Sequence, residues 1–368
     1  KFNQQHSDIK FKIIEAPSDS NQVEDLYTSS FLLGNSPYDL VYMDIVWTPK
    51  FAAAGWLRDI SDRLTPEAAQ QYLAEDIAGG MYQDKFYRLP FRSDAGMLYY
   101  RQDLLEQAGY QPPETFAQLL TISEDLQQQG LVDWGYAWQG KQSESLAAMF
   151  VEILEGHGAY WVNPDTLEVG LDRPEAIASV EFLRTTIAKK VSPPGVTTYA
   201  EDETRLLFQN GKVAFLRNWP FVYSLAADSA IAGKYQIKPM VHAPGKKSGA
   251  ALGGWGLGIS TTTKHPDAAW QVLEFLSSEE SQREFVLKTG FLPSRVALFN
   301  DPAIVAKYNY YPQLLDVIQN SALRPPISQY AQTSDILQRY LSAAITGKMT
   351  SKAAMQNAAQ ETRNLLER

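Results

Sequence analysis

The sequence predicts an α/β protein built from two lobes. Short apolar runs typical of strands alternate with longer segments typical of helices, which is the pattern of α/β folds. At 368 residues the chain is too long for one compact core, which indicates two or three domains. No stretch has the composition of a flexible linker, so any boundary between domains must run through strands.

The first part of the chain contains three strand candidates. Residues 9–14 alternate apolar and polar side chains, as a strand with one buried face does. Residues 38–44 are mostly apolar and end on the carboxylate of Asp44, which indicates a buried parallel strand whose C-terminal end lies at a site. Residues 98–100 are the third candidate.

Helices are expected to fill most of the remainder. Residues 103–108 predict a short helix that stops at Gly109, and Thr115 with Gln118 has the spacing of a capping box that opens the next helix. The C-terminal third is expected to be helical from about Pro312. The other expected helices are 176–189, 202–210, 266–288, 333–341 and 351–367, and the other expected strands are 212–216 and 257–260.

Composition and charge exclude several classes of function. A net charge of −9 and an isoelectric point near 5.1 give no electrostatic reason to bind nucleic acid or anionic lipid. Without cysteine the chain has no disulfide, thiol nucleophile or thiolate metal site. No apolar run reaches the ~18 residues of a membrane span. The chain opens on Lys1 without a secretion signal, so we expect a mature or trimmed chain.

Two tryptophans at glycine or proline breaks point to a binding surface, because rings at such breaks tend to be displayed. Trp219 precedes Pro220, which prevents a strand ladder from continuing. Trp255 lies in the run Gly253-Gly254-Trp255-Gly256, whose glycines we expect to let the backbone bend as it crosses between lobes. Displayed rings among carboxylates, amides and arginine are typical of a surface that holds a polyol. Both positions favour a sugar site over a core.

Asp44 and the nearby Trp47 allow two interpretations. Either the carboxylate accepts sugar hydroxyls while the ring covers the apolar face of a pyranose, or Asp44 caps the next helix and Trp47 belongs to the core. Arg92-Ser93-Asp94 is either a surface ion pair of little energetic weight or a crossover that offers both charges to a cleft, and we favour the cleft. Arg324, ahead of two prolines, is either incidental or held to donate several hydrogen bonds.

Motifs for catalysis are missing from the sequence. The four histidines have no metal-ligand spacing, no G-x-S-x-G or H-E-x-x-H string occurs, and the glycine run lacks the Lys-Ser or Lys-Thr of a phosphate-binding loop. We therefore expect a binding protein with no cofactor and no metal. A glycoside-active enzyme using a carboxylate pair such as Asp44 and Asp94 stays open as the competing hypothesis.

Several stretches carry a family resemblance. The run Tyr99-Tyr100-Arg101-Gln102-Asp103-Leu104-Leu105, followed by residues 108–116, resembles the signature of extracellular sugar-binding proteins of ABC importers, solute-binding protein family 1. The trehalose/maltose-binding subgroup is resembled at Met43-Asp44 with Trp47, at residues 134–142, 217–220 and 252–255, and at Arg324-Pro325. Residues 290–295 resemble the family's helix-ending motif, and the likeness covers essentially the whole chain.

The resemblance implies a hinged, type II-like periplasmic binding protein fold. Residues 1–94 with 257–302 would form one lobe and residues 95–256 with 303–368 the other, with the ligand enclosed by hinge closure. It also implies a periplasmic or extracellular monomer, with or without a lipid anchor. Such a protein delivers its ligand to the membrane permease of an ABC importer and has no nucleic-acid partner.

The resemblance also implies which residues contact the ligand and what the ligand is. The family's ligand contacts fall on Asp44, Asp94, Trp219, Gly254, Trp255 and Arg324, and we expect Ser18 and Gln22 to line the site. Two departures concern the ligand: Arg92 stands where relatives carry a tyrosine, and Val23 falls near a position where some relatives use arginine. A changed donor set alters which hydroxyls are accepted. The expected ligands are trehalose, sucrose, maltose and glucosylglycerol.

A further departure lies at the start of the chain. Relatives have a strand and a helix before the segment that matches Lys1-Phe2-Asn3, and the end of that strand supplies another ligand carboxylate. We expect this chain to be trimmed or its numbering to begin late. Without that segment, the first lobe would lack a strand and one side of its site.

Overall fold

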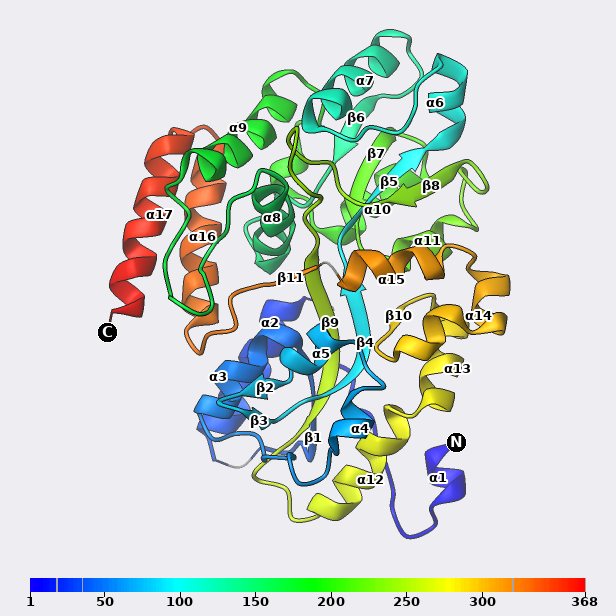
Figure 1. Cartoon of the computed structure of the whole chain (residues 1–368), viewed down its shortest axis with the longest axis vertical. Helices are drawn as coiled ribbons and strands as arrows, with labels where there is room; N and C mark the ends of the chain where they lie inside the picture. Colours follow the sequence, from blue (N-terminus) through cyan, green and yellow to red (C-terminus); the bar gives the residue numbers. More distant parts are fainter. Residues whose placement is uncertain (18, 35, 320, 368) are drawn as a thin grey trace. The chain divides into compact units, whose positions relative to one another are not determined.

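The computed structural model describes residues 1–17, 19–34, 36–319 and 321–367, and Figure 1 labels its helices and strands. The chain folds into two compact units. Unit 1 comprises Lys1–Asp94, Gly253–Gln319 and Pro326–Tyr330, and unit 2 comprises Ala95–Leu252, Asn320–Pro325 and Ala331–Arg368. The sequence-based division placed residues 253–256, 303–319 and 326–330 in the second lobe, whereas the structure packs them in unit 1.

The sheet of unit 1 is mainly antiparallel, in the order β1-β9-β4-β10. β1 (Leu40–Asp44) pairs antiparallel with β9 (Ala251–Ile259), and β10 (Leu292–Pro293) pairs antiparallel with β4 (Leu89–Ala95). A small hairpin joins β2 (Met81–Tyr82) to β3 (Lys85–Phe86). β9 also pairs in parallel with β11 (Ala322–Leu323) through its first two residues, which lie in unit 2.

Helices and two hydrophobic clusters complete unit 1. One cluster contains Leu257 and Ile259 of β9 with Leu273, and the other is aromatic and includes Phe31 and Phe51. The helices are α1 (Phe2–Gln5), α2 (Ser20–Leu32), η1 (Ile45–Trp47), α3 (Thr48–Ala53), α4 (Pro66–Ala69), α5 (Ala74–Ala78), α12 (Pro266–Leu276), α13 (Glu279–Thr289), η3 (Val296–Asn300), α14 (Pro302–Lys307) and α15 (Tyr311–Gln319).

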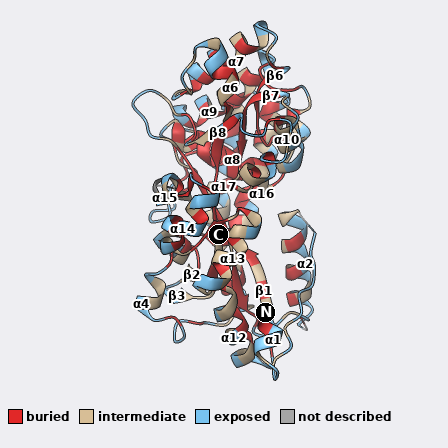
Figure 2. Cartoon of the chain, turned by 90° about the vertical axis from the view of Figure 1, so that its right-hand side faces the viewer, coloured by how far each residue is buried: buried red, intermediate tan, exposed pale blue. Residues whose placement is uncertain are grey.

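The sheet of unit 2 has the order β6-β7-β5-β8. β6 (Trp134–Ala137) runs parallel to β7 (Val213–Asn218), while β5 (Met97–Arg101) is antiparallel to both β7 and β8 (Tyr235–Lys238). Every residue of β7 is buried. Figure 2 colours the chain by burial and shows buried residues concentrated inside each unit. β7 therefore ends in the interior of the unit, and the residues that follow it emerge from that interior.

Local signals in the sequence set the helices of unit 2. α6 (Gln102–Ala108) ends at Gly109, whose φ of 77° is the left-handed conformation that glycine adopts readily. α7 (Phe116–Gln128) begins with the expected capping box of Thr115 and Gln118. The other helices are α8 (Glu144–Gly156), α9 (Pro174–Ala188), η2 (Val196–Thr198), α10 (Glu201–Gln209), α11 (Phe221–Ala226), α16 (Tyr330–Ile345) and α17 (Ser351–Leu366).

The prediction of a strand at residues 9–14 is wrong. The segment has no strand assignment, and no other strand of the described residues pairs with it. Its recorded backbone hydrogen bonds join Phe11 to the side chain of Asn3, at 2.8 Å in both directions. Ile13 and Ile14 are 73% and 57% exposed. Alternation supplies an apolar face, but a strand also needs a partner for its backbone groups.

Four further predictions need correction. The strand expected at 38–44 is β1, but its partner β9 is antiparallel rather than parallel. The helix expected at 266–288 is two helices, since Ser278 caps a new helix by accepting the Ser281 N–H. The stretch from Pro312 is helical except where β11 and the loops beside it intervene. The glycine run does not form a bend, because β9 continues through it.

Candidate functional site

On unit 1, Trp255 is the centre of the predicted site. The indole is partly exposed on β9, and its residue stands opposite Asp44 of β1 in the ladder. The Tyr42 ring lies 4.9 Å from the Trp255 ring between centroids, and the Trp47 ring lies 5.2 Å away, edge to face. Neighbouring rings thus fix the orientation of an indole that keeps one part open to solvent.

Arg92 lies beside this indole and is held on several sides. Its guanidinium carbon is 5.7 Å from the Trp255 ring centroid and 4.3 Å from that of Phe291. Nε donates to the Tyr42 hydroxyl at 2.9 Å, and Nη1 is paired with Asp94. The side chains of Arg92 and Asp94 are only 12% and 8% exposed, so they do not form a surface pair. Asp94 Oδ1 is buried and has no hydrogen-bond partner among the described residues.

Asp44 and Trp47 have clear structural roles. Asp44 is the N-cap of η1 and accepts a hydrogen bond from the Val46 N–H at 3.2 Å. Trp47 is 3% exposed and packs on Phe51, which agrees with the core interpretation of this ring. The Trp47 ring supports the Trp255 ring through an edge-to-face contact. A direct contact of either residue with a ligand stays a prediction.

Gly254 allows strands β9 and β4 to approach closely. Its φ of 131° is rarely adopted by residues with a side chain. A Cβ there would stand 3.0 Å from the Arg92 carbonyl oxygen and 3.0 Å from Asp76 Oδ1. Asp76 of α5 is fully buried and lies directly behind this glycine. A buried carboxylate therefore lies beneath the predicted site.

Burial raises the pKa of Asp76 from 3.8 to about 7, and the nearby Arg88 guanidinium partly opposes this shift. Between pH ~4 and ~7 the folded chain therefore keeps a proton that the unfolded chain has released. We expect the free energy of unfolding to decrease as pH rises across this range, by at most ~4 kcal/mol from this group, and to level off above it. Asp76→Asn should reduce the decrease, measured as urea midpoints at pH 5 and pH 8.

Asp62→Asn is the matched control, since Asp62 is exposed on the same unit. This control should keep the wild-type pH dependence. Some dependence should also remain in Asp76→Asn, because burial raises the pKa of Glu152 and Glu155 too. An Asp76→Asn variant whose unfolding depends on pH as strongly as wild type would contradict the assignment.

On unit 2, Trp219 directly follows β7, as Pro220 predicted, and its indole is partly exposed. Nε1 donates to Glu201 Oε1 at 3.2 Å, and the Trp219 carbonyl accepts from the Tyr99 hydroxyl at 2.8 Å. The guanidinium carbon of Arg217 lies 4.2 Å from the ring centroid. The ring is thus held at its edge, its backbone and one face.

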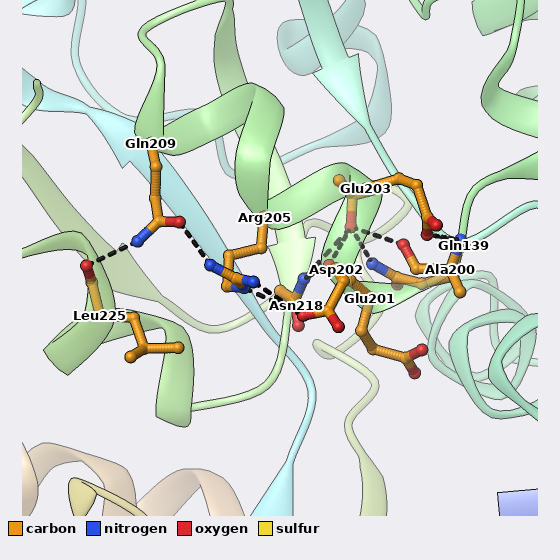
Figure 3. A network of polar contacts seen from close by, with 10 residues as sticks. Gln139, Ala200, Glu201, Asp202, Glu203, Arg205, Gln209, Asn218 and Leu225 are labelled. Carbon is orange, nitrogen blue, oxygen red and sulfur yellow. Dashed lines mark hydrogen bonds and ion pairs between the residues drawn. The ribbon is translucent and has the colours of Figure 1, made fainter. Parts of the chain in front are cut away.

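A polar network fixes the end of β7 against the start of α10 (Figure 3). Asn218 Nδ2 donates to the Glu201 carbonyl at 3.1 Å. Gln139 Nε2 donates to the Arg217 carbonyl at 2.9 Å. Both amides also donate to the Thr204 hydroxyl, at 3.2 and 2.8 Å. The strand end that carries Trp219 is therefore tied to a helix rather than to a free loop.

Two glutamates and the buried Arg324 form a polar cluster in unit 2. Arg324 Nη1 donates to Glu144 Oε1 at 2.5 Å, and the Ser334 hydroxyl donates to Glu144 Oε2 at 2.6 Å. Ser145 Oγ donates to Glu201 Oε2 at 2.7 Å, so α8 and α10 present their first turns to one cluster. Arg324 is held in place, as its position before two prolines suggested.

Sequence reasoning missed Glu144 and Glu201. Each begins a helix, where a carboxylate is favoured by the helix dipole, so each could be explained without a site. Arg324 follows Glu144 by 180 residues in the chain, a separation over which no local pattern operates. The missed partners of Arg92 are Tyr42, which shares a strand face with Asp44, and Phe291 of the helix-ending motif.

Ser18 and Gln22 were also predicted to line the site. Ser18 lies outside the described residues, and Gln22 is an exposed residue of α2 whose N–H donates to Asp19. A cavity of about 560 Å³ in unit 1 lies among residues 8–16 and β1, lined by Tyr42 but by none of the predicted ligand contacts. Its lining is mainly apolar, unlike the two surfaces described above.

The fold and these two surfaces define a two-unit α/β protein with aromatic and charged surfaces suited to binding a polar solute. Residues 1–283 match the model of the bacterial extracellular solute-binding protein family, and the chain belongs to this family. In the described part, no helix is long and apolar enough to cross a bilayer. No group of histidine and carboxylate side chains there is arranged to hold a metal ion.

Solved structures and curated proteins are similar over nearly the whole chain. A maltose-bound T. maritima MalE3 structure is 35% identical with a TM-score of 0.93, covering 99% of this chain and 94% of that one. A probable ABC transporter-binding protein of Deinococcus radiodurans is 28% identical over 93% of this chain and 82% of its own length. A mannitol-binding protein of Pseudomonas aeruginosa is 24% identical over 100% of this chain and 88% of its own length.

Proposed function

We propose that this protein is the sugar-binding component of an ABC importer and captures a disaccharide-sized glucoside outside the cytoplasmic membrane. The observation that carries the proposal is that each unit bears a partly exposed indole bordered by an arginine and carboxylates. Indole planes cover the apolar face of a pyranose, while carboxylates and guanidinium groups bind its hydroxyls. The proposal assigns both surfaces to sugar binding.

The same geometry supports a proposal for the ligand class. A flat ring favours a ligand with a pyranose, so maltose, trehalose, sucrose and glucosylglycerol rank above open-chain polyols such as mannitol. Relatives support both possibilities, since a maltose-bound structure and a mannitol-binding protein are among them. We further propose that the protein acts as a monomer and passes its ligand to the permease of the importer. Membership of the bacterial extracellular solute-binding protein family supports a location outside the cytoplasmic membrane.

A glycoside-active enzyme using two carboxylates is the competing hypothesis. The structure gives Asp94 a partner in Arg92 and gives Asp44 a capping role toward Val46. Both carboxylates are thus engaged in contacts that suit fixed hydrogen-bond acceptors. We therefore assign them to holding a sugar rather than cleaving it.

One panel of ligands tests the proposal and separates it from the alternative. Thermal unfolding is measured with maltose, trehalose, sucrose, glucosylglycerol, mannitol and ribitol, each in excess. At 100 times Kd a ligand should stabilise the folded chain by ~2.7 kcal/mol, and we expect this for at least one glucoside. No stabilisation by any glucoside would contradict the proposal. Reducing sugar released from trehalose or sucrose would instead support the enzyme.

A further inference from the structure

A buried ion pair lies in the interior of unit 2, behind Trp219. Arg217 of β7 and Glu152 of α8 are both fully buried. Arg217 Nε donates to Glu152 Oε2 at 2.7 Å, Nη2 donates to Oε1, and Nη1 donates to Gln139 Oε1 at 3.1 Å. A buried ion pair is often no more stabilising than apolar side chains of similar volume. Stability alone therefore does not explain the presence of this ion pair.

The pair reaches the predicted sugar surface through the indole ring. The guanidinium carbon of Arg217 lies 4.2 Å from the centroid of Trp219, close enough for a cation–π interaction. The bidentate bonds to Glu152 fix the plane of the guanidinium, and the indole then has one preferred position against it. Loss of either charge would free the ring on this face.

The pair also lies beside three of the segments by which the chain passes between units. These three segments are at Asp94/Ala95, at Leu252/Gly253 and at Asn320–Pro325, and a further passage falls at Tyr330/Ala331. Next to the first, Gly96 packs so closely that a Cβ would overlap the Glu152 carboxylate and Arg217. Next to the second, the Ala251 backbone donates a hydrogen bond to Glu152. From the third, Arg324 interacts electrostatically with Glu152.

We propose that Arg217 and Glu152 are positioning residues for sugar binding, which hold the Trp219 ring in a fixed orientation relative to these three passages of the chain. The inference rests on the proposed function, because it assigns Trp219 to the sugar. It adds a role for two residues that cannot themselves be exposed to a ligand, since both are fully buried. The interactions of the pair beside these three passages make the orientation of the ring dependent on the backbone conformation there.

The test uses Glu152→Gln, which keeps the shape and removes the charge, and Arg217→Lys, which keeps the charge and loses the planar fork. Two quantities are measured: the Kd for maltose and the acrylamide quenching of Trp219 without ligand. The contribution of Trp219 is the difference between each protein and the same protein carrying Trp219→Phe. We expect both variants to raise the Kd about 10-fold and to increase quenching of Trp219.

Asp172→Asn is the matched control, because Asp172 pairs with Arg363 at 2.8 Å in the same unit and does not contact Trp219. It should change neither quantity. Unchanged quenching and Kd in both variants would overturn the proposal, and so would a higher Kd with unchanged quenching. If one variant fails to fold by circular dichroism, the other decides. If wild type does not bind maltose, the proposed ligand is wrong, and quenching alone still tests the pair.

Discussion

Trp219→Ala is expected to weaken maltose binding by about 10- to 100-fold while the fold persists. The partly exposed indole contributes little to the core, but its loss would remove ~1–3 kcal/mol of contact with a pyranose face. Titration calorimetry measures the change, and Trp219→Phe should give an intermediate Kd because a smaller ring remains.

Trp134→Ala is the matched control for this experiment. Trp134 is also partly exposed in unit 2, but it pairs with Val213 at the start of β7, whereas Trp219 follows the end of that strand. This control should leave the Kd unchanged. Equal affinities of wild type and Trp219→Ala for every glucoside that binds would remove Trp219 from the site.

Gly96→Ala is expected to destabilise the protein by ~1–3 kcal/mol or more, because the added methyl group has no space. A Cβ at this position would overlap the carboxylate of Glu152 and the guanidinium of Arg217, and neither group can swing into solvent. The free energy of unfolding is measured with urea, followed by circular dichroism.

Two comparisons isolate the cause of this loss. Gly130→Ala, where nothing lies within 4 Å but φ is +73°, should cost only the ~1 kcal/mol of backbone strain. In a double-mutant cycle, Gly96→Ala and Glu152→Ala should be clearly non-additive, since the second change removes the overlapping group. Additive effects would show that the methyl group meets something else.

Trp219 could be placed from the sequence because its position depends on local chemistry. Pro220 has no N–H for a ladder, so β7 ends at Asn218 and α11 starts at Phe221. The glycines beside Trp255 have a different role, which depends on tertiary packing. They do not break β9 but allow β4 to approach it closely, because a Cβ on Gly256 would stand 2.5 Å from the Leu89 carbonyl oxygen. This requirement for glycine depends on the neighbouring strand, so the local sequence could not reveal it.

The polar partners of the site could not be predicted because they come from distant parts of the chain. Ser334 and Arg324 meet Glu144 across 190 and 180 residues. For Asp44, the local interpretation and the functional one are compatible. The carboxylate caps η1, and it also lies at the end of a strand beside Trp255. Sequence patterns give the type of each element, while tertiary pairing decides what its side chains meet.

Residues 9–14 have a practical consequence for handling the protein. In the described chain their backbone belongs to no helix or strand, and its hydrogen bonds are those between Phe11 and Asn3. Such a ribbon, with isoleucines 73% and 57% exposed, is a template for intermolecular β-pairing. Lys10 and Lys12 oppose that association by charge repulsion, and this protection weakens in concentrated salt. Storage at low ionic strength should therefore keep the protein dispersed for longer.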